Sequence, residues 1–183
     1  SPQSVATLHV ANEAMDRGDY AAAATAYRKV HEAAPGFVAG TRRLCVAEAR
    51  SGEADAAVRD CREALAAESS AENHAALAVA LMALGSNAHG EVALAKKEAN
   101  EAVKLAPEAE FAQLTSCQVA YEAADLDALD RCSGKLATIE PDAATTHFFA
   151  AVALFGHQDL TAARTEPEQA RAKGIDPNLH GAK

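Results

Sequence analysis

The chain has 183 residues, enough for an ordinary domain with a buried core. Hydrophobic residues make up 49%, but only 4% are aromatic and Trp is absent, so Ala, Leu and Val dominate. Because Ala favours helices and lets them pack closely, the composition predicts an all-α protein. Seventeen basic residues against 26 acidic ones leave a net charge of -9, without the basic stripe typical of a nucleic-acid binder. We therefore expect no nucleic-acid partner.

No apolar segment approaches the roughly 20 residues that a membrane-spanning helix needs. The longest candidate, residues 75–84, is short and suits a buried helix, so we expect no transmembrane segment in this chain. The sequence begins Ser-Pro-Gln-Ser without Met, which indicates a trimmed or processed chain. Whether a signal peptide or lipid anchor preceded residue 1 stays open.

Turn and terminator residues recur along the chain with a period of about 34 residues, which is typical of helical-repeat proteins. The recurring pairs are Gly18-Asp19 and Gly52-Glu53, Pro107 and Pro141, and Asp125-Leu126 and Asp159-Leu160. The chain therefore divides into five approximate units, which we expect to form a single domain over residues 1–183. The units are 4–37, 38–70, 71–108, 109–142 and 143–177.

The first unit shows the pattern most fully. Leu8, Ala11 and Met15 recur at helical spacing, Gly18 supplies a tight turn, and a second helix begins near Tyr20. Pro35 ends that second helix. The other units repeat this helix–turn–helix pattern with variations.

Two irregularities lie further along the chain. The third unit carries about five extra residues at 85–90, which predict a surface loop that either carries a contact or is merely tolerated. In the fifth unit, Pro167 interrupts the expected second helix, and residues 165–168 resemble a capping box that restarts one. An atypical last repeat is what a solenoid cap requires.

The repeated features resemble the tetratricopeptide repeat (TPR) family over roughly residues 4–177. The matching residues are Ala11, Gly18, Asp19, Tyr20, Ala23, Tyr27 and Pro35 in unit one, Leu77, Ala78, Leu81, Gly85, Ala95, Ala99, Ala102 and Pro107 in unit three, Cys117, Asp125, Leu126, Leu136 and Pro141 in unit four, and Ala151, Asp159, Leu160 and Ala163 in unit five. The resemblance implies an all-α, right-handed superhelical solenoid of about five antiparallel helical hairpins, in a bacterial protein. The family's aromatic residue early in the first helix is replaced here, by Thr7, Thr41, His74, Gln113 and His147.

The four cysteines form two pairs, each within one predicted hairpin. Cys45 and Cys61 lie about 16 residues apart and Cys117 and Cys132 about 15 apart, with the turn near the middle of each interval. At 1.5 Å per residue, both members of a pair rise about 12 Å from the turn on antiparallel helices and should face each other. This predicts two disulfides and an oxidising, periplasmic or otherwise exported setting. The alternatives are cysteines that merely fill small apolar positions, in a cytoplasmic protein, or a zinc site, for which the Cys-x2-Cys spacing is missing.

No catalytic pattern is visible. The seven His residues are scattered, with no His-Glu-x-x-His motif, and Gly residues occur singly rather than in a phosphate-binding loop. We therefore expect neither an enzyme, nor a cofactor, nor a metal.

In the TPR family, the first helix of each repeat lines a concave face. The groove residues that the resemblance implies here are Met82, Phe111, Leu114, Gln118, Tyr121, Phe148, Val152 and Phe155, with Arg42 and Arg50. Four of the chain's eight Phe and Tyr residues are in this set, and aromatic side chains often supply binding energy at interfaces. Core packing of the aromatics and simple solvation of the two arginines are the alternatives.

The sequence thus predicts a non-enzymatic scaffold or adaptor that binds a protein or peptide through its concave face. The alternative is a structural assembly protein that oligomerises through its terminal repeats. The sequence does not determine the partner, the oligomeric state or a role for the 85–90 loop.

Overall fold

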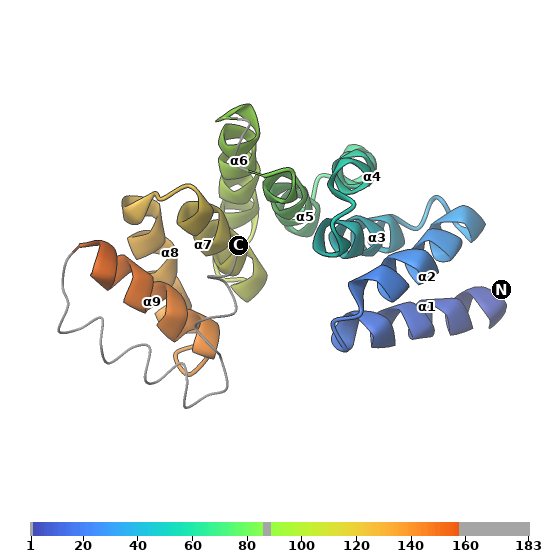
Figure 1. The fold of residues 1–183 in the computed structure, drawn as a ribbon, viewed down its shortest axis with the longest axis horizontal. Coiled ribbons are helices and arrows are strands. Elements are labelled where there is room, and N and C mark those ends of the chain that lie inside the picture. The colour runs from blue at the N-terminus through green and yellow to red at the C-terminus, as the bar shows by residue number, and fades with distance from the viewer. Residues whose placement is uncertain (1, 86–88, 158–183) are drawn as a thin grey trace. The chain divides into compact units, whose positions relative to one another are not determined.

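A computed structural model describes residues 2–85 and 89–157, and every regular element within them is an α-helix (Figure 1). Consecutive helices pair as antiparallel hairpins, so the predicted all-α fold of helical hairpins is confirmed. The helices are α1 (Pro2–Asp16), α2 (Tyr20–Ala33), α3 (Val38–Ser51), α4 (Ala54–Ala67), α5 (Ala71–Ala83), α6 (His89–Leu105), α7 (Glu110–Glu122), α8 (Leu126–Ile139) and α9 (Ala144–Gly156).

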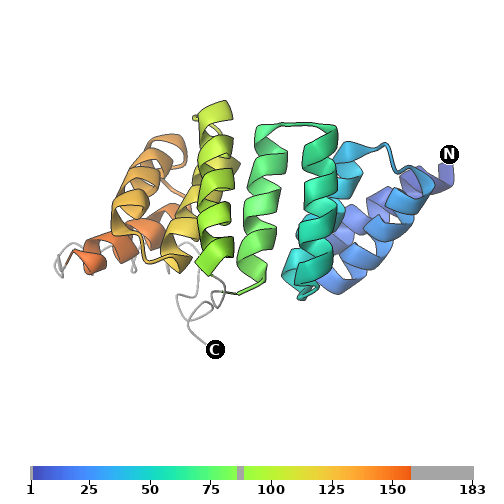
Figure 2. The ribbon, with the colours of Figure 1, turned by 90° about the horizontal axis from the view of Figure 1, so that it is seen from above.

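The chain divides into two compact units, residues 1–105 and 106–183. Unit 1 holds the hairpins α1–α2, α3–α4 and α5–α6, which follow one another in chain order (Figure 2). Unit 2 holds the hairpin α7–α8 and the helix α9. A single domain over residues 1–183 stays a prediction. The expected cap at 165–168 and Pro167, and the centre of the 85–90 loop, lie outside the described residues.

Tight turns join the two helices of a hairpin, and two of them show how one residue takes the left-handed conformation. Gly52 ends α3 with a φ of 92°, and an added Cβ would meet nothing within 4 Å, so the backbone rather than space requires glycine there. In the α7–α8 turn Ala124 takes this conformation, with a φ of 51°. Asp125 then caps α8 by accepting a hydrogen bond from the Ala128 amide at 3.1 Å.

The interior is built mainly from small residues, which allow helices to approach closely. In the α1–α2 hairpin, fully buried Ala11 and Ala23 accompany one large side chain, Tyr27. The Tyr27 hydroxyl donates a hydrogen bond to Asn12 Oδ1 at 2.7 Å, so its polar end is satisfied. This core explains how a chain with few aromatics packs.

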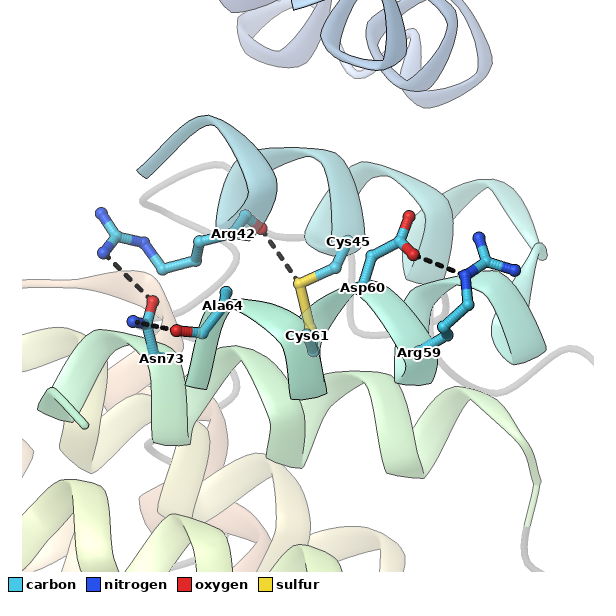
Figure 3. Close-up of a disulfide and its surroundings, with 7 residues drawn as sticks. All are labelled: Arg42, Cys45, Arg59, Asp60, Cys61, Ala64 and Asn73. Carbon is cyan, nitrogen blue, oxygen red and sulfur yellow. Dashed lines mark hydrogen bonds and ion pairs between the residues drawn. A yellow bond between two sulfur atoms is a disulfide. The ribbon is translucent and has the colours of Figure 1, made fainter. Parts of the chain in front are cut away.

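Disulfides occupy the middle of two other hairpins. Cys45 and Cys61 lie one repeat after Ala11 and Tyr27, and the structure joins their sulfurs at 2.05 Å (Figure 3). Cys117 and Cys132 are joined at 2.01 Å in the α7–α8 hairpin. These are the pairings that the sequence predicts. All four side chains are buried, so neither bond is open to solvent.

Buried polar side chains near the start of first helices tie each helix to the chain that precedes it. Asn73, with no exposed surface, donates from Nδ2 to the Ala64 carbonyl at 3.2 Å and to the Glu68 carbonyl at 2.7 Å. Gln113 Nε2 and Thr146 Oγ1 make equivalent bonds, each 2.8 Å long, to the carbonyls of Pro107 and Glu140. Hydrogen bonds therefore stand at or next to the positions where the TPR family places an aromatic side chain.

The two disulfides generate a prediction of stability. Replacing both Cys45 and Cys61 by Ala should lower the free energy of unfolding by about 3 kcal/mol, because the unfolded chain regains the entropy of a closed loop. Urea unfolding of this variant and of the matched Cys117→Ala/Cys132→Ala variant measures the loss.

A thiol titration of the denatured, unreduced protein should find no free thiol, and four free thiols would contradict both disulfides.

Candidate functional site

An apolar face on the first helices of unit 2 is the candidate binding site. We call it the α7–α9 face, and it consists of Phe111, Leu114, Gln118, Tyr121, Phe148, Val152 and Phe155. On α7 these residues recur at intervals of three or four, and on α9 likewise, so they share one side of each helix. All seven are among the groove residues that the sequence implied.

The centre of the α7–α9 face rests on the core of unit 2. Leu114, Tyr121, Phe148 and Val152 are partly buried against the cluster that includes the disulfide Cys117–Cys132. The Tyr121 and Phe148 rings meet edge to face with centroids 5.7 Å apart, which joins α7 to α9. Packing holds these side chains in fixed orientations.

The ends of the α7–α9 face are open to solvent. Phe155 is 66% exposed and Phe111 is 36% exposed, although both are large and apolar. Phe155 lies on the last turn of α9, which packs closely on α8, because an added Cβ on Gly156 would lie 2.4 Å from Leu126. An ion pair between His157 Nε2 and Asp130 Oδ2, at 2.7 Å, lies next to it. Phe155 is thus exposed at a helix end that packs on α8.

The remaining predicted groove residues lie in unit 1. Met82 is half-buried on α5, and Arg42 and Arg50 lie on α3. Because they belong to the other compact unit, the structure does not join them to the α7–α9 face. One groove running through all ten residues stays a prediction.

Three arginines, Arg42, Arg43 and Arg50, lie on α3, and we call them the α3 face. Arg50 Nη1 donates to the Tyr20 hydroxyl at 3.2 Å, with its guanidinium 5.4 Å from the centre of that ring. The other two, Arg42 and Arg43, bond to amide oxygens of asparagines. Among the described residues, all three therefore meet neutral partners. Arg43 was not among the predicted groove residues.

The most perturbed ionisable group is Glu48, which lies inside unit 1 rather than on either face. It has no exposed surface, and Arg28 Nη2 donates to its Oε1 at 2.7 Å and to Glu53 Oε2 at 2.9 Å. Burial, the largest cause, raises the pKa of Glu48 to about 7, with the Asp60 carboxylate adding to the effect and Arg28 opposing it. The Asp60 carboxylate accepts a bond from Arg59 Nε at 2.7 Å (Figure 3). This network joins α2, α3 and α4 and is structural.

The described part of the chain holds neither a group of metal-ligating side chains nor a membrane-spanning helix. There, no three His, Cys, Asp or Glu side chains are grouped so that they could hold a metal ion. None of the described helices is long and apolar enough to cross a membrane. The arrangement can present surfaces to a partner.

Tandem antiparallel hairpins with glycine turns and small residues at their crossings define a helical-repeat protein. The chain has the fold of the TPR proteins, as solved structures show. TTC0263, described as a thermophilic TPR protein in Thermus thermophilus, matches with a TM-score of 0.83 and 16% identity, over 93% of this chain and 91% of that one.

Two further TPR-fold structures match over most of their length. YrrB, described as a TPR protein with an unusual peptide-binding site, gives a TM-score of 0.61 and 18% identity, over 96% of this chain and 89% of that one. The pilF protein of Pseudomonas aeruginosa gives 0.73 and 18%, over 94% and 77%. No family model and no curated protein matches the sequence. At these identities the likeness establishes the fold.

The buried Glu48 generates a prediction of pH dependence. The folded chain binds the proton of the Glu48 carboxyl more tightly than the unfolded chain does, because the pKa of Glu48 in the unfolded chain is near 4.5. The contribution of this proton to the free energy of unfolding is therefore complete below about pH 4.5. The effect should be lost as the pH rises through about 7. Relative to Glu48→Gln, we expect the wild type to lose roughly 1–3 kcal/mol of unfolding free energy between about pH 5 and pH 8.

Urea unfolding at several pH values measures both proteins. Using the difference between them removes the titration of the other carboxylates, which the two chains share. A constant difference over this range would contradict the raised pKa.

Proposed function

We propose that this chain is a non-enzymatic scaffold that binds a peptide segment of a partner protein on the α7–α9 face. The exposure of Phe155 and Phe111 at the two ends of a packed aromatic centre carries the proposal. Exposed large aromatics on a fixed surface are typical anchors for a partner. The TPR fold supports a role in protein interaction, and one of the similar structures is described as having a peptide-binding site.

The packing beneath the α7–α9 face favours binding over mere exposure. Tyr121 and Phe148 are held by the core, so a ligand that contacts them meets side chains whose rotamers are already restricted. Less conformational entropy is then lost on binding than on a mobile surface. Gln118 lies half-buried between the apolar residues and offers an amide to a peptide backbone.

The two cysteine pairs support an oxidising setting for this function. We propose a periplasmic or otherwise exported scaffold. Because both disulfides are buried, they stabilise the α3–α4 and α7–α8 hairpins without occupying the α7–α9 face or the α3 face. Four reduced cysteines would instead favour a cytoplasmic protein.

Peptide binding can be measured with ligands selected from a random peptide library and labelled for fluorescence anisotropy. Phe155→Ser should weaken a selected peptide at least about tenfold, because an anchor residue is worth more than roughly 1.4 kcal/mol. Leu94→Ser is the matched control, since Leu94 is 41% exposed but lies on α6. Equal affinities of the wild type and Phe155→Ser would place the site elsewhere.

A specific observation also favours the second candidate function, self-assembly through a terminal repeat. Val10 of α1 lies one repeat before Leu44 and corresponds to Leu77 in the repeat after that. Leu44 and Leu77 are 1% and 5% exposed, whereas Val10 is 55% exposed. Leu44 packs against residues of α2, so α1 presents the face that a preceding helix covers elsewhere in the array. A second copy of the chain would extend the same kind of contact.

Light scattering over a dilution series tests this candidate. The mass should rise toward that of a dimer at high concentration. Val10→Asp should raise the protein concentration at the midpoint of this transition by at least about tenfold, because association would then bury a charge. Leu94→Asp, on α6, is the control. A monomer at every concentration would rule out assembly through α1.

A further inference from the structure

Among the described residues, the two helices of the α7–α9 face carry glutamates but no Lys or Arg. Exposed Glu110 and Glu122 lie at the two ends of α7, and α9 carries His147. The described basic side chains of unit 2, Arg131 and Lys135, both lie on α8. An apolar surface with acidic ends is the result.

The two glutamates lie close to the apolar residues of α7. Glu110 precedes Leu114 by four residues, and Glu122 follows Gln118 by four, so each is one turn beyond a member of the face. With a rise of 1.5 Å per residue, the two positions are about 18 Å apart along α7. A peptide that covers the aromatic centre therefore meets a carboxylate whichever way it is directed along α7.

Within residues 2–85 and 89–157, no ion pair joins Glu110 or Glu122 to a cation, whereas Glu108 has one. Glu108 pairs with Lys135 Nζ at 2.6 Å, so this lysine of α8 lies on a different carboxylate. Glu110 and Glu122 are exposed. Their charge is thus presented to solvent, and to whatever binds beside Phe111 and Tyr121.

We infer that the α7–α9 face selects a peptide that carries Lys or Arg residues on either side of its apolar anchors. This inference rests on the proposed function and adds the chemistry of the partner. Burial of the anchors on Phe155, Tyr121 and Phe148 supplies the affinity, while the acidic ends favour basic flanks and repel acidic ones. The α3 face, with its three arginines, has the opposite sign and does not fit this ligand.

The test uses three synthetic peptides of about 12 residues with identical Leu and Phe anchors at helical spacing. Their flanking positions carry Lys in the first, Gln in the second and Glu in the third. We expect the Lys peptide to bind about three- to tenfold more tightly than the Gln peptide, because exposed charge pairs are individually weak, and the Glu peptide to bind most weakly. Raising the salt from about 50 to 500 mM should remove most of this difference.

Variants of the protein separate local charge from net charge. Glu110→Gln with Glu122→Gln should reduce the preference for the Lys peptide to less than about twofold. The matched control changes two exposed acids elsewhere in unit 2, Asp127→Asn on α8 and Glu140→Gln at its end, and should leave the preference intact. An equal loss in both double variants would mean that only the overall charge of the protein acts, which overturns the inference.

Two outcomes distinguish this inference from the proposed function beneath it. If the Lys and Gln peptides bind equally and Phe155→Ser weakens both, the face binds peptides but does not select basic ones, and the inference is wrong. If Phe155→Ser leaves all three affinities unchanged, or none of the peptides binds, the inference fails for these ligands. In the second case, the library-selected peptides test the proposed function separately. If Phe155→Ser leaves their affinities unchanged as well, the proposed function also fails.

Discussion

The close approach of the two helices in each hairpin is the constraint on which the rest of this structure depends. Ala11, Cys45 and Cys117 hold equivalent places on first helices and are fully buried. A larger side chain at any of them would push the helices apart. Because the backbones are close, two cysteines on opposite helices reach bonding geometry, with Cα atoms 5.3 Å apart in the α3–α4 hairpin and 5.5 Å apart in the α7–α8 hairpin.

An interior of small residues has an energetic consequence. Each buried CH2 group contributes roughly 0.8 kcal/mol, so an alanine core gains less from the hydrophobic effect than a core of leucine and phenylalanine. The disulfides and the buried bonds of Asn73, Gln113 and Thr146 offset part of that difference. Some large apolar side chains therefore lie on the surface, and in unit 2 the exposed ones, Phe111 and Phe155, belong to the α7–α9 face.

Local pattern predicted much of this molecule, and tertiary contact explains what it did not predict. The repeat period predicted the hairpins, and the similar distances of the two cysteines in each pair from their turn predicted the pairings. The buried bonds of Asn73 and Thr146 were missed, since the pattern pointed one residue later, to His74 and His147. The Arg28–Glu48 network was missed because its partners lie on different helices, α2 and α3, and no local signal relates them. The sequence named Phe155 as a groove residue, but its exposure depends on how α9 packs on α8.

The net charge of -9 describes neither the α7–α9 face nor the α3 face. Three arginines lie on α3, whereas the α7–α9 face has glutamates at the ends of α7 and no Lys or Arg on its own helices. Within a distance of about 8–10 Å at physiological salt, a ligand responds to these local groups rather than to the total. Apolar contact would let many segments bind to Phe155 and Phe111, and a repelled acidic segment is as much a part of specificity as an attracted basic one. The repeat fold makes such a division possible, because each first helix presents its own outer side chains while the small residues beneath keep the packing unchanged.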